Sequence, residues 1–231
     1  AALAVGPHIQ YAVVPAGPEG ATADGDRFLL AVDLVGAHAK ELGYADADAA
    51  RAAVTETIPG ARLGGLAYAP LFTDIADYYS GHVEIPNYTN PLDGQQALPE
   101  TRHVGNAFRI LVDDYVSTDD GTGVVHQAPA YGEDDQRVCE ANGIPVLLSV
   151  DSGARFLPLF AREDTGRGDI DEIAGVQVFE ANRTIVRALR DLGRVAREAS
   201  YEHSYPHCWR CRKPLIYRAV TSWYVAVTQV K

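Results

Sequence analysis

Short apolar segments separated by glycine, proline and aspartate are the feature that most limits how this 231-residue chain can fold. Runs of this kind, rich in β-branched and aromatic side chains, are typical of β-strands. The predicted strands are residues 9–14, 28–32, 82–85, 107–112, 123–127, 146–150, 215–220 and 223–227. They outnumber the predicted helices and do not alternate strictly with them. We therefore expect a β-rich α/β fold with a closed, Greek-key-like β-barrel core and peripheral helices, rather than a doubly wound sheet.

Three helices are expected around this core, over residues 32–42, 133–142 and 180–192. A glycine directly follows each of them, and glycine is the residue that most often ends a helix. The third helix carries four apolar residues at the spacing of one core-facing stripe. These are Ile185, Ala188, Leu189 and Leu192. The Asp-Ala repeat at residues 46–49 predicts either a surface loop or a helix start.

The length suits one good-sized domain or two small ones. No apolar run approaches the ~20 residues that cross a bilayer, and the first five residues lack the basic start of a signal peptide. Methionine is absent, position 1 included, so we expect the chain to be a piece excised from a longer protein. Three cysteines, Cys139, Cys208 and Cys211, cannot form a disulfide framework, which suits a reduced, cytoplasmic compartment.

Charge is unevenly distributed along the chain. Twenty basic residues against 31 acidic ones give a net charge of -11, which argues against general affinity for phosphate backbones. Residues 183–218, however, contain nine basic and three acidic residues. Such a region either contacts RNA through one face or forms a solvated charged helix, and charge alone favours the solvated helix.

Residues 121–135 combine more polar and turn-forming residues than any other segment, with the sequence GTGVVHQAPAYGEDD. The two glycines allow a tight turn that another backbone or a ligand can approach closely. His126 then lies at the end of a short predicted strand. Glu133, Asp134 and Asp135 open the following helix, where acids satisfy free amide groups and favour the helix dipole. Each of these residues, taken singly, is explained by such a structural role.

His126 and Asp135 are more specific as a pair. A strand-end imidazole and a first-turn carboxylate, nine residues apart across a turn, can line one pocket. An aspartate, ionised at neutral pH, suits an ammonium group, and the imidazole would form a partly polar wall. The nucleophile-elbow, zinc-protease and P-loop signatures are absent from the sequence.

The segment at 121–135 resembles the signature of the editing (connective peptide 1) domain of class I aminoacyl-tRNA synthetases for branched aliphatic amino acids. Residues 204–219, SYPHCWRCRKPLIYRA, with the TSWY two residues later, are similar to the part by which that domain rejoins the catalytic body. Residues 63–72 (LGGLAYAPLF) and 179–193 (FEANRTIVRALRDLG) add support. The resemblance covers essentially the whole chain. The His126 pattern and HCWRC favour the isoleucyl branch over the valyl and leucyl branches.

The resemblance implies one editing domain over residues 1–231, with residues 203–231 rejoining the synthetase body. It implies a hydrolase that removes valine wrongly attached to isoleucine tRNA, and that also acts on valyl-adenylate. ATP binding would belong to the full-length enzyme. The implied partners are the 3′ end of that tRNA and the rest of the synthetase chain, in the cytoplasm, with no membrane.

Site roles also follow from the resemblance. Asp135 would hold the α-ammonium group of the substrate, and His126 would shape a pocket that admits valine and excludes isoleucine. The backbone of Gly121, Thr122 and Gly123 would approach the terminal adenosine. Water would attack the ester with help from the terminal ribose hydroxyl, so editing is expected to need no cofactor, metal or covalent nucleophile.

Two departures from the family pattern concern completeness. In the family a threonine-rich segment that forms part of the editing pocket lies just before the residues matching 3–7, so we expect the pocket of this chain to be incomplete. Cys208 and Cys211 resemble two zinc ligands whose partners lie upstream of this domain. A structural zinc site needs four ligands, so we expect a half-site that is empty in this chain, although His203 and His207 are nearby.

Two other functions fit parts of the sequence. A non-catalytic tRNA-binding module would use the basic region at residues 183–218 and the CxxC. A thiol redox protein would use Cys208 and Cys211, but no thioredoxin-like βαβ context surrounds them, which disfavours this hypothesis.

Overall fold

The computed structural model describes residues 1–19, 25–71, 83–84, 101–102, 107–119, 121–157, 173–200, 202, 204–220, 222 and 225–228. Its strands are β1 (Ala2–Val5), β2 (Gln10–Pro15), β3 (Arg27–Ala31), β4 (Glu56–Pro59), β5 (Val83–Glu84), β6 (Thr101–Arg102), β7 (Ile110–Val112) and β8 (Val124–Gln127). Its α-helices are α1 (Ala47–Ala52), α3 (Glu133–Ala141) and α4 (Val178–Asp191). The short 3-10 helices are η1 (Val32–Leu34), η2 (Gly36–His38) and η3 (Gly60–Arg62).

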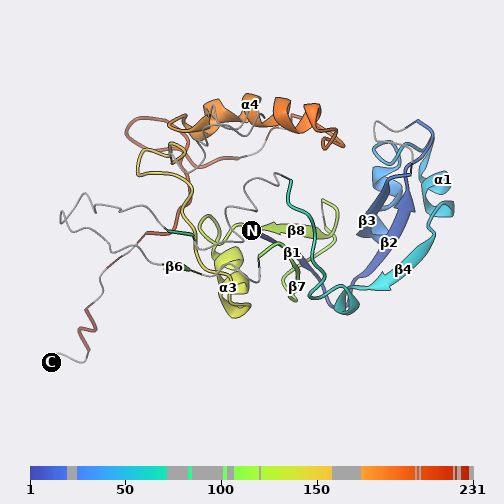
Figure 1. The fold of residues 1–231 in the computed structure, drawn as a ribbon, viewed down its shortest axis with the longest axis horizontal. Coiled ribbons are helices and arrows are strands. Elements are labelled where there is room, and N and C mark those ends of the chain that lie inside the picture. The colour runs from blue at the N-terminus through green and yellow to red at the C-terminus, as the bar shows by residue number, and fades with distance from the viewer. Residues whose placement is uncertain are drawn as a thin grey trace.

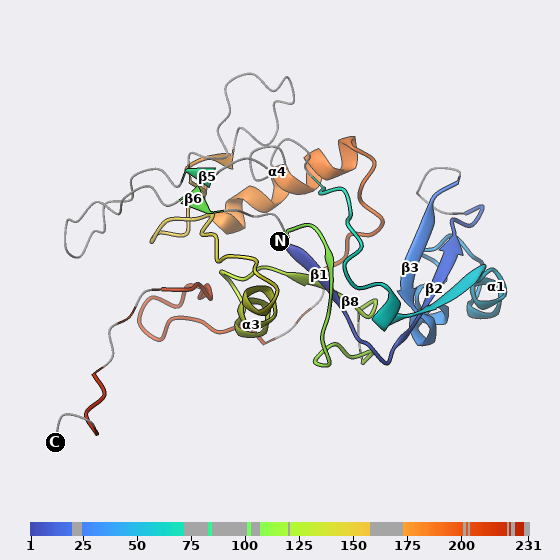
Figure 2. The same cartoon turned by 60° about the horizontal axis from the view of Figure 1, so that its bottom comes forward.

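Two three-stranded sheets form the framework, as Figure 1 shows. In the first sheet β1 lies between β7, to which it is parallel, and β8, to which it is antiparallel. In the second sheet β2 lies between β3 and β4, antiparallel to both. β5 and β6 form a separate two-stranded pair. The view in Figure 2 shows α3 close to β1 and β8, and α1 close to β2 and β4.

Three apolar clusters hold these elements together. One joins the two sheets and includes Val5 of β1, Tyr11 of β2 and Ile110 of β7, all buried. Another packs Val138 and Cys139 of α3 against the first sheet. The remaining cluster lies between the β2–β3 hairpin, the 3-10 turns and α1. The second cluster packs α3 against β1 and β7, and β1 in turn pairs with β8, the strand that carries His126.

The structure has the mixed α/β content that the sequence predicts. β2, β3 and β8 lie within one residue of predicted strands, and β7 forms the end of the strand expected at 107–112. Among the described residues the two sheets are not closed into a barrel, so the closed Greek-key-like barrel stays a prediction.

Several predicted strands are short or wrong. Residues 146–150 contribute only an isolated bridge from Val150 to Phe156, and residues 215–220 form no strand. The strand predicted at 82–85 contains the two residues of β5 and otherwise lies outside the described residues. Of the strand predicted at 223–227, residues 223 and 224 lie outside the described residues, and residues 225–227 form no strand.

The helices at 133–142 and 180–192 are confirmed as α3 and α4, and the glycines after them have positive φ, as helix-ending glycines commonly do. The helix predicted at 32–42 is wrong, because the structure has η1, η2 and turns there. Glycine and β-branched valines weaken an α-helix, and a Cβ on Gly36 would lie 2.4 Å from the Arg51 guanidinium. At the Asp-Ala repeat, Asp46 caps α1 by accepting a hydrogen bond from the amide of Ala49 at 2.8 Å.

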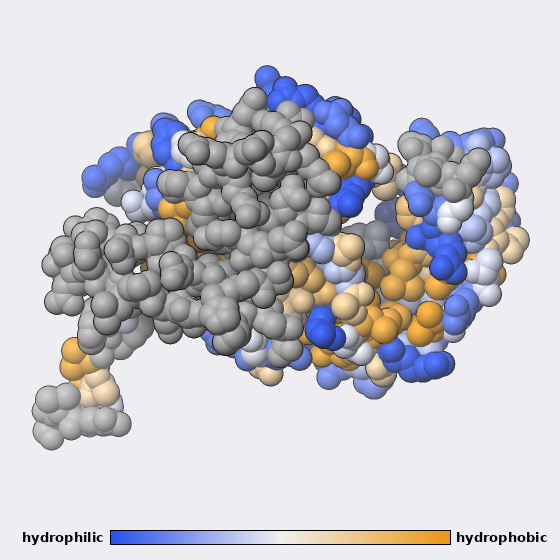
Figure 3. Space-filling model, viewed as in Figure 1, coloured by the Kyte–Doolittle hydropathy of each residue, from blue (hydrophilic) through white to orange (hydrophobic). Residues whose placement is uncertain are grey.

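The surface is mixed in character. Figure 3 shows hydrophilic residues along the upper edge of this face, where α4 lies, and hydrophobic residues over the lower middle, between the two sheets. No helix in the described part of the chain is long and apolar enough to span a bilayer.

Candidate functional site

Asp135 lies in the first turn of α3, but its carboxylate does not cap that helix. Gly132 is the N-cap residue and provides no side-chain cap. The Oδ2 atom of Asp135 instead accepts a hydrogen bond of 3.0 Å from the amide of Ala128, seven residues earlier and directly after β8. The half-buried carboxylate thus ties the start of α3 to the end of β8, and its other oxygen has no hydrogen-bond partner among the described residues.

His126 is the third residue of β8 and lies opposite Leu3 of β1. Its side chain is exposed, whereas the next residue, Gln127, is fully buried, so the strand alternates between surface and core. Desolvation by the surrounding protein atoms lowers the pKa of His126, and the negative charge of Asp135 opposes this shift. The charge of Asp135 thus acts on the imidazole of His126.

The Gly121–Thr122–Gly123 turn lies at the other end of β8. Its carbonyl oxygens face the second sheet: that of Thr122 accepts from the Ala31 amide at 2.8 Å, and that of Gly123 accepts from the Tyr11 hydroxyl at 2.7 Å. The Gly121 oxygen lies 2.6 Å from a ring nitrogen of His38. The turn therefore joins the two sheets, and roughly 10 Å of extended strand separates it from His126.

The two glycines of this turn give a stability prediction with an internal control. Both have positive φ, but a Cβ on Gly123 would lie 2.7 Å from the Ala31 Cβ, whereas a Cβ on Gly121 would meet open space. Gly123→Ala is therefore expected to lower the free energy of unfolding by about 2–4 kcal/mol, from backbone strain plus overpacking. Gly121→Ala should cost only about 1–2 kcal/mol, from the backbone strain alone. Urea unfolding of the two variants compares these costs, and equal losses would contradict the role assigned to Ala31.

Cys208 and Cys211 lie in a hairpin in which the Cys208 amide donates to the Lys213 oxygen at 2.8 Å. Hydrogen bonds from the backbone of Cys211 and Arg210 lower the pKa of the Cys208 thiol. Amides directed at a sulfur suit a thiolate ligand, so the pair fits two positions of a zinc site. Within the described ranges, however, no group of three or more His, Cys, Asp or Glu side chains can hold a metal ion. His203 lies outside those residues.

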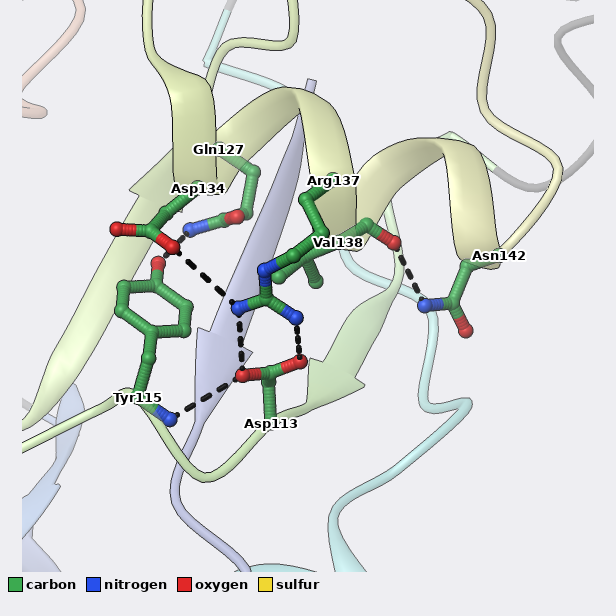
Figure 4. Close-up of polar contacts among 7 residues, drawn as sticks. All are labelled: Asp113, Tyr115, Gln127, Asp134, Arg137, Val138 and Asn142. Atoms are coloured by element: carbon green, nitrogen blue, oxygen red, sulfur yellow. Dashed lines mark hydrogen bonds and ion pairs between the residues drawn. The ribbon is translucent and has the colours of Figure 1, made fainter.

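A cluster beside Asp135 was not predicted from the sequence. The Arg137 guanidinium donates to both carboxylate oxygens of Asp113, at 2.9 and 3.0 Å, and lies over the Tyr115 ring. The Tyr115 hydroxyl in turn accepts a hydrogen bond from the side-chain amide of Gln127 at 2.5 Å (Figure 4). Asp113 and Arg137 are 24 positions apart, a separation that no local pattern reveals. The only local signal is an arginine in the helix that begins with three acids.

The segment expected to rejoin a synthetase body touches the same region. The Ala219 amide donates to the Ala130 oxygen at 2.7 Å, in the turn between β8 and α3. The Arg218 guanidinium donates to the Val150 oxygen at 3.4 Å. The turn between β8 and α3 is therefore also held by the C-terminal segment of the chain.

Comparison with known proteins shows which class of protein this chain is similar to. No family model matches the chain. Aminoacyl-tRNA synthetases match it along its whole length: one from Leifsonia xyli subsp. xyli is 54% identical over 239 residues, covering 100% of this chain and 19% of that protein. One from Corynebacterium diphtheriae is 42% identical over 231 residues (100% and 18%), and one from Tropheryma whipplei strain Twist is 39% identical over 227 residues (98% and 18%).

The synthetase in all three cases is isoleucine--tRNA ligase. The homologues of this chain are therefore isoleucine--tRNA ligases, as the motifs of the isoleucyl branch predict. The chain spans about a fifth of the length of the curated relatives it matches.

Proposed function

We propose that this chain is the editing domain of an isoleucine--tRNA ligase and hydrolyses the ester of valine wrongly attached to isoleucine tRNA, and valyl-adenylate as well. The whole of residues 1–231 forms this domain, and residues 203–231 lead back to the synthetase body. The partners are the 3′ end of the tRNA and the rest of the ligase, in the cytoplasm. A closed barrel belongs to the same proposal.

The observation that carries the proposal is the position of Asp135. Its carboxylate is held by the Ala128 amide through one oxygen, and its charge raises the pKa of His126. An ordinary first-turn acid would bond the free amides of its own helix. This one is directed at the strand end, where a substrate can use the second oxygen.

A second selection step is needed because a single binding pocket discriminates only weakly between isoleucine and valine. One methylene is worth only ~1–3 kcal/mol of selectivity in an apolar pocket, a limit already known for synthetases of this branch. Hydrolysing what is small enough to enter a second pocket multiplies the selectivity. His126 then acts as the wall that stops the larger isoleucine.

In the reaction the Asp135 carboxylate pairs with the α-ammonium group and so orients the ester. Water adds to the ester carbonyl, and the bond from that carbon to the tRNA ribose oxygen breaks. The ribose oxygen takes up a proton, and free valine leaves. Residues 121–123 contact the terminal adenosine in this proposal, at the far end of β8. Zinc, where the full-length ligase binds it, is held in part by Cys208 and Cys211 and has a structural role.

The direct test compares two substrates on the full-length ligase that carries this segment. Valyl-tRNA and isoleucyl-tRNA, both on isoleucine tRNA, are incubated with the enzyme, and release of the amino acid is followed. Valine should be released at least about tenfold faster, because the extra methylene of isoleucine meets the wall of the pocket. Equal rates, or hydrolysis of neither ester, would contradict the proposal.

A non-catalytic tRNA-binding module is less well supported. In the basic region, Arg190 forms an ion pair with Glu198, and Arg197 pairs with Glu41 at 2.6 Å. These acids neutralise part of the charge that phosphate contacts would need. The same deacylation assay separates the two functions, because a binding module leaves both esters intact.

A further inference from the structure

The start of α3 is held by a second tie, on the far side of the helix from Asp135. Arg137 comes two residues later, and two residues of an α-helix turn through about 200°. Asp135 is bonded to the Ala128 amide, and Arg137 is bonded to Asp113 beyond the end of β7. The packing of Val138 and Cys139 holds α3 against the first sheet, and hydrogen bonds on opposite faces of the helix limit its rotation further.

Asp113 is a firm anchor for this second tie. Its own amide donates to the Val5 oxygen at 3.1 Å, and its carboxylate accepts from the Tyr115 amide at 3.1 Å. Hydrogen bonding to Arg137 is the main reason that the pKa of Asp113 is lowered, and the same bond raises the pKa of Arg137. The paired geometry uses both arms of the guanidinium, which a lysine cannot reproduce.

The two ties also form a closed ring, which Figure 4 shows in part. Tyr115 follows Asp113 closely along the chain, and its hydroxyl accepts from Gln127. Gln127 precedes Ala128, whose amide donates to Asp135, and α3 connects Asp135 back to Arg137. Gln127 is fully buried, and its Oε1 atom has no hydrogen-bond partner among the described residues.

We propose that Arg137 is a positioning residue for substrate selection: its two-armed pair with Asp113 sets the rotation of α3 so that Asp135 offers its free oxygen to the ammonium group of the substrate. This rests on the proposed editing function. The pair is partly exposed, with 52% of the Arg137 side chain and 21% of the Asp113 side chain accessible. Pairs this exposed add little to stability, so their loss need not unfold the domain.

The test uses the full-length ligase and two esters on isoleucine tRNA. One carries valine and the other carries isovalerate, which has the same carbon skeleton without the amino group. The measured quantity is the ratio of kcat/KM for the valyl ester to kcat/KM for the isovaleryl ester. Arg137→Lys keeps the charge but cannot form the two parallel hydrogen bonds to Asp113. It should lower this ratio about tenfold, mainly through a higher KM for the valyl ester. The isovaleryl ester should change less than twofold.

Asp113→Asn is the second variant, because it keeps an oxygen for the Tyr115 amide and is expected to fold. It should lower the ratio to a similar extent. Arg51→Lys is the matched control: Arg51 also lies in a helix and pairs with an aspartate, Asp48, at 3.1 Å, but in α1. It should leave the ratio unchanged.

An unchanged ratio in both Arg137→Lys and Asp113→Asn would overturn the proposal, and so would an equal loss on both esters, which indicates general damage to the site. Asp135→Asn distinguishes this failure from failure of the editing function itself. If Asp135→Asn lowers the ratio and the other two variants do not, the editing function stands and the positioning role falls. If Asp135→Asn leaves the ratio unchanged, both fall together.

Discussion

Asp135→Ala in the full-length ligase is expected to slow deacylation of valyl-tRNA on isoleucine tRNA about 100-fold, while aminoacylation with isoleucine stays unchanged. A charge-assisted hydrogen bond contributes about 1.5–3 kcal/mol, and 2.7 kcal/mol corresponds to a factor of 100. The alanine removes both the charge offered to the ammonium group and the tie to the Ala128 amide. Deacylation is measured with labelled valyl-tRNA, and aminoacylation in parallel with labelled isoleucine.

The two contributions of Asp135 can be separated with Asp135→Asn. Asparagine keeps an oxygen for the Ala128 amide but has no charge, so a similar loss in this variant assigns the effect to the charge. Glu133→Gln is the control, because Glu133 is an exposed acid of the same helical turn. It should edit at the normal rate. Normal clearance of valyl-tRNA by Asp135→Ala would remove the ammonium role from this residue.

The sequence predicts α3 and the turn before β8 well because their causes are local. Acids open the helix, Gly143 ends it, and two glycines with positive φ bracket the turn at Thr122. Such signals lie within a few residues of the structure that they determine. They therefore also place His126 near the end of β8 and Asp135 in the first turn of α3.

Other features depend on partners that are distant in sequence. The pair between Asp113 and Arg137 and the bond between Gln127 and Tyr115 exist only because β1 brings β7 and β8 together. The apolar segment at 215–220 looks like a strand, yet a strand needs a neighbour to bond, and among the described residues it has only single contacts, such as Leu215 to Pro206. Composition alone does not supply such a neighbour.

The helix predicted at 32–42 shows how tertiary packing overrides a local pattern. Its apolar spacing fits a helix, and Val35 and Leu42 are indeed buried. Gly36, however, lies against the Arg51 side chain of α1, and the backbone there forms two short 3-10 turns. One of these turns brings His38 to the Gly121 oxygen. The departure from a regular helix therefore serves the junction between the two sheets.

His126→Ala is expected to make the editing site attack correctly charged isoleucyl-tRNA, with at least about a tenfold rise in its deacylation. Removing the imidazole frees more volume than the one methylene by which isoleucine exceeds valine, and filling a pocket with one methylene corresponds to ~1–3 kcal/mol.

The lowered pKa of His126 gives a prediction for the pH dependence of editing, because an imidazole that is neutral at pH 7 does not repel the ammonium group held by Asp135. Acidification below that pKa places a second positive charge there, so KM for the valyl ester should rise as the pH falls.

The His126 experiment has its control in His8→Ala, because His8 is an exposed histidine whose nearest acid, Asp114, is 3.7 Å away. That variant should leave isoleucyl-tRNA intact. In His126→Ala, deacylation of isoleucyl-tRNA is followed together with the yield of isoleucyl-tRNA during aminoacylation, which should fall as the product is destroyed. A variant that still spares isoleucyl-tRNA would show that another side chain sets the upper size limit. Asp135 would then hold the ammonium group in a pocket whose wall lies elsewhere.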